Sequence, residues 1–198
     1  MNNSDKIILD LCGGTGAWSK PYKDAGYDVR LITLPENDVR TYLPPENIYG
    51  ILAAPPCTEF SVAKGNKPRD FTDGMSVVNS CLQIIWKCRK QNKLAFWAME
   101  NPRGFLRQFI GKPPFVFEQW QYGDIGIKPT DLWGYYSIPK ATVKNRPDGL
   151  TIKFPNGKTN SVSWTTSYYP KEYKHLGLAV LRAMTPPGFA QAFFMANQ

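Results

Sequence analysis

The sequence predicts an α/β protein with a mostly parallel central sheet, on three observations. Four apolar runs have the length of buried strands: residues 6–11, 26–34, 49–54 and 94–99. The first run leads directly into a glycine-rich turn, residues 12–19, which opens a short helix through about Asp24. The third and fourth runs both end at prolines that carry reactive or polar neighbours. Strand, glycine turn, helix and strand in this order are typical of a Rossmann-like sheet.

In the rest of the chain, the alternation of strand and helix patterns is weaker. A long helix is predicted to start at a cap on Thr72 or Asp73 and to run to about Gln91, with Cys81 and Cys88 on its apolar face. We expect a short helix at 104–109, a strand at 113–120, a turn at 128–134, a hairpin turn at 155–158 and a closing helix at 189–197.

Length and composition narrow the class of protein. A chain of 198 residues is one domain, or one domain with a small appendage. Its formal net charge of +8 favours a polyanionic partner such as nucleic acid. Four cysteines without a Cys-x-x-Cys pair and a single histidine predict no metal site. With no signal peptide and no apolar run near 20 residues, we expect a cytoplasmic protein that does not contact a membrane.

Cys57 stands at the most informative position. It follows the run 49–54 and the pair Pro55-Pro56, which ends a strand because proline has no N–H group to give a sheet. Ligands of open α/β sheets collect at the carboxyl ends of the strands. A thiol at that edge is either a packing residue on a tight turn or a nucleophile.

A second stretch favours the nucleophile. The run 94–99 leads into Glu100, Asn101 and Pro102. Like the run 49–54, it is therefore an apolar strand that ends at a proline beside a reactive or polar side chain. Adjacent parallel strands hold Cys57 and Glu100 side by side. A thiol beside a carboxylic acid suggests covalent addition to a substrate that is assisted by protonation.

Taken in order, these motifs resemble those of the DNA cytosine-5 methyltransferases, most closely the compact, phage-type members. The shared features are the glycine turn, Pro56-Cys57 with Phe60-Ser61 behind it, Glu100-Asn101, Tyr122-Gly123 and an Arg-x-x-Thr-Pro block at 182–186. The resemblance implies a Rossmann-like S-adenosylmethionine-dependent methyltransferase fold and a minimal target-recognition segment. It also implies a soluble enzyme in a bacterial host, with a monomer favoured.

The resemblance assigns a cofactor site for S-adenosyl-L-methionine. Gly14 and Gly16 let the methionine part approach the turn, and Trp18 takes the aromatic position that contacts the cofactor. Asp38 corresponds to the residue that binds the adenine amino group. Pro56 and Asn101 line the space between cofactor and base. The acid that holds the ribose hydroxyls is missing near Thr33-Leu34, where Glu36 is a substitute.

For the substrate, the resemblance implies DNA with the target cytosine flipped out of the duplex. Cys57 adds to C6 of the ring, and Glu100 donates a proton to N3. Ser61 belongs to the matching Pro-Cys-x-x-Phe-Ser element. The family's Gln-x-Arg-x-Arg block is absent after Tyr122-Gly123, so Lys128 and Thr130 are the nearest polar substitutes for contacting the base.

Three functional classes stay open at this point. The first is a DNA cytosine-5 methyltransferase, the second a catalytically silent relative that binds nucleic acid, and the third a pyrimidine C5 methyltransferase acting on RNA or nucleotides. We expect three parts: a catalytic core at 1–134, a short basic insertion at 135–181 in place of a full target-recognition domain, and a C-terminal helix at 182–198 that packs back on the core. Lys64, Lys67 and Arg69 are expected to clamp the nucleic-acid backbone together with this insertion.

Overall fold

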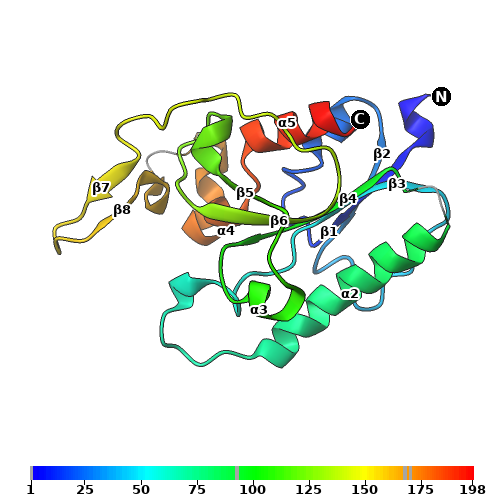
Figure 1. Ribbon diagram of the computed structural model, residues 1–198, viewed down its shortest axis with the longest axis horizontal. Helices are drawn as coiled ribbons and strands as arrows, with labels where there is room; N and C mark the ends of the chain where they lie inside the picture. Colours follow the sequence, from blue (N-terminus) through cyan, green and yellow to red (C-terminus); the bar gives the residue numbers. More distant parts are fainter. Residues whose placement is uncertain (1, 92–93, 167–168, 170) are drawn as a thin grey trace.

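The computed structural model describes residues 2–91, 94–166, 169 and 171–198. Its centre is a six-stranded sheet in the order β2-β1-β3-β4-β6-β5 (Figure 1). The strands are β1 (Ile7–Leu11), β2 (Asp28–Ile32), β3 (Ile48–Ala53), β4 (Phe96–Pro102), β5 (Phe115–Glu118) and β6 (Pro129–Tyr135). Strands β2, β1, β3 and β4 are parallel neighbours, and β6 is antiparallel to both β4 and β5. This confirms a mixed α/β fold with a mostly parallel sheet, compatible with a Rossmann-like methyltransferase fold.

Helices cover both faces of the sheet. They are α1 (Lys20–Asp24), α2 (Phe71–Lys90), α3 (Leu106–Ile110), α4 (Gly177–Ala183) and α5 (Pro187–Ala196). In Figure 1, α2 and α3 lie below the sheet and α5 lies above it, while α4 lies at the left, toward the hairpin end. Short 3₁₀ segments complete the chain: η1 (Asn3–Asp5), η2 (Val62–Lys64), η3 (Gln119–Tyr122), η4 (Val162–Trp164) and η6 (Lys171–Leu176).

Alternate residues of the strands feed two separate cores, as the period of two in a strand requires. Leu9 and Leu11 of β1 pack in one cluster with Val78 and Ile85 of α2. Ile8 packs in the other with Tyr22 of α1 and with the aromatic side of α5. Since both faces are buried, the strands read as continuous apolar runs in the sequence, which is why they could be predicted.

The long helix α2 begins one turn earlier than predicted. Its N-cap is Asp70, whose Oδ1 accepts a hydrogen bond from the backbone N–H of Asp73 at 2.9 Å. The predicted caps, Thr72 and Asp73, are therefore wrong, and both lie within the first turn of the helix. Cys81 and Cys88 are buried in the face of α2 that meets the sheet, as predicted.

The segment predicted as a turn at 128–134 is instead β6. Its polar residues had argued against a strand, but Asp131 is fully buried and accepts a bidentate hydrogen bond from Arg107 of α3. A carboxylate that is neutralised in this way can occupy a central strand. Pairing with β6 also extends β4 beyond its expected end, so Glu100 and Asn101 lie within the strand, opposite Leu132 and Asp131.

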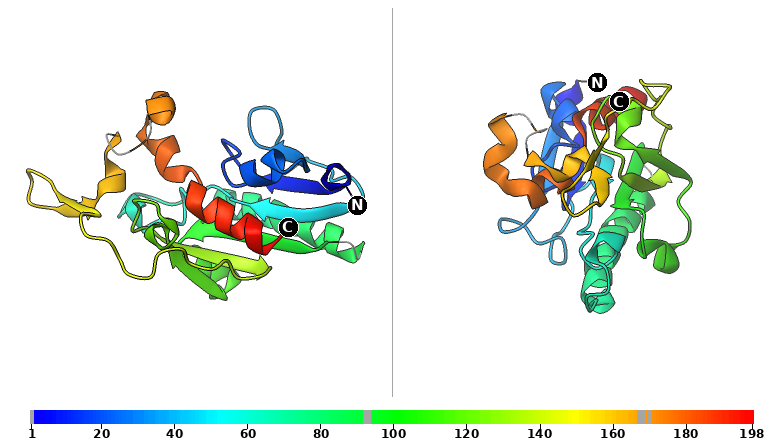
Figure 2. Two further views of the ribbon diagram at one scale, coloured as in Figure 1. Left: turned by 90° about the horizontal axis from the view of Figure 1, so that it is seen from above. Right: turned by 90° about the vertical axis from the view of Figure 1, so that its left-hand side faces the viewer.

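The region after β6 is mostly irregular, apart from a small hairpin. Strands β7 (Thr151–Lys153) and β8 (Thr159–Ser161) pair across the predicted turn, where the N–H of Gly157 bonds to the carbonyl of Phe154. The hairpin projects from one end of the molecule (Figures 1 and 2). Further on, the boundary expected between 181 and 182 falls inside α4, and α5 lies against α1 and η3.

Candidate active site

Cys57 follows β3 through a rigid turn at the carboxyl edge of the sheet. The N–H of Ala54 still bonds to the carbonyl of Leu11 at 2.9 Å, so the backbone is held up to the two prolines. The carbonyl of Cys57 then accepts bonds from the N–H groups of Phe60, at 3.0 Å, and Ser61, at 2.8 Å. The thiol is thereby presented on a tight turn, partly exposed. Packing does not explain this position, because Cys57 belongs to neither core cluster.

Cys57 and Glu100 line the same cavity, which has a volume of about 260 Å³. Strands β3 and β4 are parallel neighbours, with Ala53 opposite Met99, and this register brings the two side chains to one edge. The other walls are the glycine turn at 12–15, the turn at 54–58, Pro102, Lys128, and Val180 with residues 183–185 around the end of α4. We call this space the Cys57 cavity.

Burial shapes the charges in the Cys57 cavity. Desolvation raises the pKa of the Glu100 carboxyl group, and the nearby Lys128 ammonium opposes that shift. Desolvation also raises the pKa of the Cys57 thiol; Lys128 lowers it and the Glu100 charge raises it. Burial therefore favours the protonated form of Glu100. Lys128 stabilises negative charge on either group, and Arg182 also stabilises it on Cys57.

Asn101 does not line the Cys57 cavity; it supports the turn that forms part of the cavity wall. The side chain is almost fully buried, and its Nδ2 donates to the carbonyl of Pro55 at 2.9 Å. This bond ties β4 to the turn that carries Cys57. Its Oδ1 is buried without a hydrogen-bond partner among the described residues. Of the two residues assigned between cofactor and base, Pro56 lines the Cys57 cavity, whereas Asn101 holds the frame around it.

The glycine turn rests on a buried carboxyl group. Asp10 is fully buried at the end of β1 and accepts a hydrogen bond from the Ser19 hydroxyl at 2.6 Å. A Cβ atom on Gly13 would stand 2.3 Å from Cγ of Asp10, so only glycine fits there. Gly14 has a φ of +54° with open space around its Cβ position, and it lines the Cys57 cavity. Backbone and carboxyl group thus fix the turn against the sheet.

A second, larger cavity continues past the glycine turn. It has a volume of about 620 Å³ and shares Thr15 and Met184 with the Cys57 cavity. Gly16 lines it, together with side chains of α1, β2 and α5, and we call it the α1–α5 cavity. This volume lies in the range of small-molecule sites. The two glycines assigned to the cofactor therefore border two connected spaces.

Asp10 gives a prediction about stability and pH. Burial raises the pKa of Asp10 from 3.8 to about 6. The folded state then binds this proton more tightly than the unfolded state, so the stability it contributes is complete below pH 3.8 and is lost as the pH rises through about 6. Asp10→Asn removes the titrating carboxyl group, and the amide oxygen that replaces it still accepts the hydrogen bond from the Ser19 hydroxyl. Between pH 4 and pH 7, we expect the free energy of unfolding of the variant to gain on the wild type by about 2 kcal/mol.

Urea unfolding at pH 4, 5, 6 and 7 measures that difference. Asp5→Asn is the matched control for the loss of one carboxyl group, because Asp5 is exposed near the N-terminal end of the chain. A constant difference between Asp10→Asn and the wild type across the four pH values contradicts the burial of a titrating carboxyl group.

Trp18 does not lie where a cofactor contact was expected. Its side chain is 1% exposed and packs edge-on against Phe193 of α5, with ring centroids 5.4 Å apart. It also contacts Phe189, and it lines neither the Cys57 cavity nor the α1–α5 cavity. Burial of Trp18 joins the turn before α1 to the aromatic side of α5. In this structure Trp18 has a packing role, and its contact with the cofactor stays a prediction.

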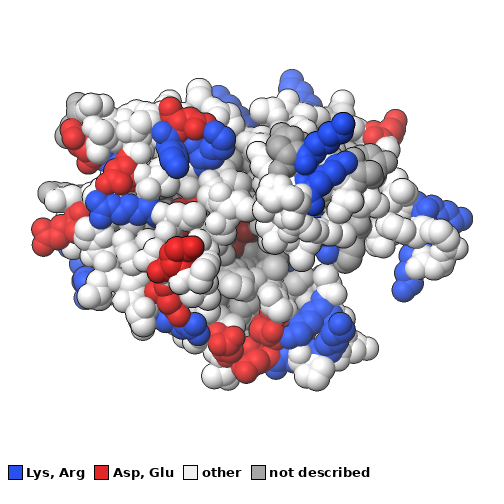
Figure 3. Space-filling model, turned by 180° about the vertical axis from the view of Figure 1, so that it is seen from behind, with Lys and Arg blue, Asp and Glu red and all other residues white. Residues whose placement is uncertain are grey.

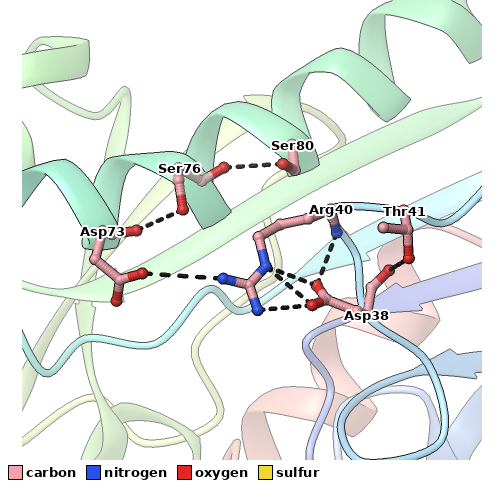
Figure 4. A network of polar contacts seen from close by, with 6 residues as sticks. All are labelled: Asp38, Arg40, Thr41, Asp73, Ser76 and Ser80. Carbon is pink, nitrogen blue, oxygen red and sulfur yellow. Dashed lines mark hydrogen bonds and ion pairs between the residues drawn. The ribbon is translucent and has the colours of Figure 1, made fainter.

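Asp38 is part of a polar network outside the two cavities (Figure 4). Both of its carboxylate oxygens accept bonds from the Arg40 guanidinium, and this pairing lowers the pKa of Asp38. Arg40 also lies 3.9 Å from the carboxylate of Asp73 in α2. The network pins the loop after β2 to the first turn of α2. Glu36, the substitute for ribose binding, is exposed on the same loop.

The residues assigned to the substrate lie in different surroundings. Lys128 faces the Cys57 cavity, and its Nζ donates to the carbonyl of Arg182 at 3.2 Å. Thr130 is buried in β6 and borders only a small space of about 10 Å³ beside Glu100. The hydroxyl of Ser61 accepts a bond from the N–H of Ala63 and caps η2. Of the three, only Lys128 reaches the cavity.

In the loop after Cys57, two of the three cations that were expected to clamp a nucleic acid contact groups of the loop itself. Lys64 forms an ion pair with Glu59, and both side chains are mostly buried. Arg69 donates to the carbonyls of Glu59 and Gly65 and stands over the ring of Phe105. Lys67 is exposed. Two of the three cations therefore hold the loop closed on Glu59, and a contact of this loop with nucleic acid stays a prediction.

The structure brings into the Cys57 cavity residues to which the sequence gave no individual role: Cys12 of the glycine turn, residues 183–184 of the Arg-x-x-Thr-Pro block, and Val180, which lies outside both motifs. Cys12, with a φ of +57°, borders the Cys57 cavity and has its thiol against that of Cys81. Val180, Ala183 and Met184 close the cavity from α4 and the residue after it. Helix α4 lies in a stretch without a clear apolar period, so only the fold reveals its place.

Searches of the described residues give two negative results. No group of three or more histidine, cysteine, aspartate or glutamate side chains is arranged to hold a metal ion. None of the helices in the described part of the chain has the length and apolar character needed to cross a bilayer.

Comparison with known proteins gives one informative relative. No family model matches the chain. The chain is similar to the Type II methyltransferase M.AplI of Arthrospira platensis, with 25% identity over 210 residues. The match covers 90% of this chain and 58% of that protein. The chain therefore spans little more than half the length of that relative.

Proposed function

We propose that this protein transfers a methyl group from S-adenosylmethionine to C5 of cytosine in DNA, through a covalent bond between Cys57 and C6 of the base. Its similarity to a Type II methyltransferase supports methyl transfer to DNA in general. The observation that carries the finer proposal is the Cys57 cavity, in which a turn-mounted thiol, a carboxyl group of raised pKa and the Lys128 ammonium meet beside the glycine turn.

This set of groups favours carbon as the methylated atom. An exocyclic amino group carries its own lone pair and needs no covalent activation. C5 of cytosine becomes nucleophilic only when a group adds to C6 and breaks the aromaticity of the ring. Cys57 is placed for that addition, and Glu100 for protonation of N3. A thiol at this edge is unexplained by methylation of an amino group.

The residues around the two cavities fit the methyl donor. Gly14 and Gly16 leave the backbone of the turn open on the sides of the Cys57 cavity and the α1–α5 cavity. When bound, S-adenosylmethionine supplies the electrophilic methyl group. The turn, Thr15 and Met184, which border both spaces, would hold it there.

The chain's own residues then act in a definite order. The Cys57 thiolate forms a bond to C6 as the C5=C6 double bond opens, while Glu100 gives its proton to N3 and becomes a carboxylate. Lys128 stabilises that new charge. After C5 has gained the methyl group and lost its proton to solvent, the C6–S bond breaks and restores the double bond. Cys57 leaves as a thiolate, and Glu100 recovers the proton from N3.

The test is a parallel assay with labelled S-adenosylmethionine and three acceptors: duplex DNA, RNA and dCMP. Digestion of the product to nucleosides identifies the methylated atom. We expect label in 5-methylcytosine from DNA. Label in N4-methylcytosine or N6-methyladenine overturns the C5 assignment, and label only in RNA or dCMP overturns the assignment of DNA.

Asp38 tests how the donor is held. If Asp38 accepts a hydrogen bond from the adenine amino group, Asp38→Ala weakens binding of S-adenosylmethionine by about 1–3 kcal/mol, because that donor loses its partner. Arg40→Gln is the control: it removes the guanidinium that occupies the carboxylate and leaves Asp38 in place. Isothermal titration of both variants measures the effect. Unchanged affinity in Asp38→Ala shifts the adenine or ribose contact to Glu36 or to a backbone group.

A further inference from the structure

A polar recess lies beside the Cys57 cavity, at the base of the hairpin β7–β8. It has a volume of about 260 Å³, and we call it the hairpin recess. Its walls come from segments far apart in the sequence: the chain between η3 and β6, strand β8 with η4, and helix α4. Apart from one isoleucine, the described side chains that line it are cations, hydroxyls and amides.

The charged and hydroxyl groups of the hairpin recess suit an anion. Arg182 and Lys128 both line it. Burial lowers the pKa of Arg182, because its guanidinium is partly withdrawn from water. Ser161 and Ser163 are each 7% exposed, and the Ser163 hydroxyl donates to that of Ser161 at 2.9 Å. Cations with converging hydroxyls are the side chains that bind phosphate oxygens.

The recess is coupled to the Cys57 cavity through one residue. Lys128 lines both spaces, and its Nζ donates to the backbone carbonyl of Arg182 at 3.2 Å. The Arg182 guanidinium is also near enough to Cys57 for their charges to interact. An anion in the hairpin recess therefore lies one side chain away from the reacting base.

Resting on the proposed function, we propose that the hairpin recess binds a phosphodiester group next to the flipped cytosine. Arg182 supplies the main contact, and Lys128 connects that contact with the reaction. The hairpin β7–β8 then positions the DNA strand without reading its base sequence, because phosphate contacts carry no base information. In Figure 3, Lys and Arg side chains are spread over that face, and some of them lie at its right end, the side of the hairpin.

The experiment measures DNA binding against salt concentration without the methyl donor. Each phosphate contact contributes about 0.9 to the slope of log K against log salt for duplex DNA, and about 0.7 for a single strand. We expect Arg182→Gln to lower the slope by that amount and Arg182→Lys to retain it. The Lys128 bond to the backbone carbonyl of residue 182 is kept in both. Arg89→Gln, at an exposed position of α2 on the other face of the sheet, is the matched control with an unchanged slope.

A second arm locates the phosphate and does not depend on the stability of a variant. Oligonucleotides carry one neutral methylphosphonate at a time near the target cytosine. The wild type should lose affinity at one position adjacent to the target, and Arg182→Gln should show no further loss at that position. If no single position affects the wild type, the recess does not hold a phosphate.

The outcomes separate this inference from the proposed function. An Arg182→Gln slope equal to that of the wild type overturns the phosphate site, even where the wild type methylates DNA. An unchanged slope with an altered preference for the neighbouring base means that the recess reads a base. Absence of methyl transfer by a wild type with the expected slopes overturns the proposed function and leaves the recess assignment standing.

Discussion

Cys57→Ala should abolish methyl transfer to DNA, to below a few per cent of the wild-type rate. The variant lacks the atom that adds to C6, and no water or neighbouring side chain replaces a covalent nucleophile on a fixed turn. Because the thiol is partly exposed and outside both core clusters, folding should be affected by less than about 1 kcal/mol. When turnover and donor affinity are measured in parallel, we therefore expect the variant to lose turnover and to keep its affinity for the donor.

Cys88→Ala is the matched control. Cys88 is buried in the α2 face, far from the cavity lining, so its loss should lower the free energy of unfolding by about 1 kcal/mol and leave turnover nearly intact. Cys81 is a poorer control because its thiol contacts that of Cys12, which lines the cavity. Turnover in Cys57→Ala above a few per cent removes Cys57 from the nucleophile's role.

Glu100→Gln should slow methyl transfer strongly and also change its pH profile. The active form of the wild type needs a protonated Glu100 and an ionised Cys57. Their ordinary pKa values are 4.5 and 9.0, and burial raises both. Between the two apparent values the pair holds one proton, and the active arrangement, with that proton on Glu100, is a minor form of this state, so kcat/KM should be bell-shaped. In Glu100→Gln only the thiol titrates, and kcat/KM should rise with pH to a plateau.

The profile is measured on DNA with saturating donor. Glu46→Gln, at an exposed position, controls for the loss of one negative charge and should keep the bell shape. If the alkaline limb persists in Glu100→Gln, a group other than Glu100 supplies the proton to N3.

The sheet could be predicted wherever the chain is buried on both faces. The runs that form β1, β3 and β4 are continuous and apolar, and their ends are marked by glycine or proline. Strand β6 escaped because Asp131 is a poor strand residue until it is paired with Arg107, which is a tertiary contact. No local pattern reports such a pair.

The candidate site was predictable only in its local parts. Cys57 and Glu100 were found because each ends or follows a strand that the sequence defines, and the two strands are neighbours. The burial of Trp18 could not be predicted, because a tryptophan after a glycine turn looks the same in the sequence whether it faces a ligand or a helix near the end of the chain. The cations Lys64 and Arg69 looked free, since their partner Glu59 acts through the folded loop.

The covalent bond itself is the most direct test of the central claim. DNA with 5-fluorocytosine at the target carries a substituent that cannot leave C5 as a proton, so the adduct between Cys57 and C6 should persist after methyl transfer. A denaturing gel should show a slow band that needs both S-adenosylmethionine and Cys57, and peptide mapping should place the DNA on residue 57. If ordinary DNA is methylated under the same conditions and no such band forms, methylation proceeds without a bond to Cys57 and the account is wrong.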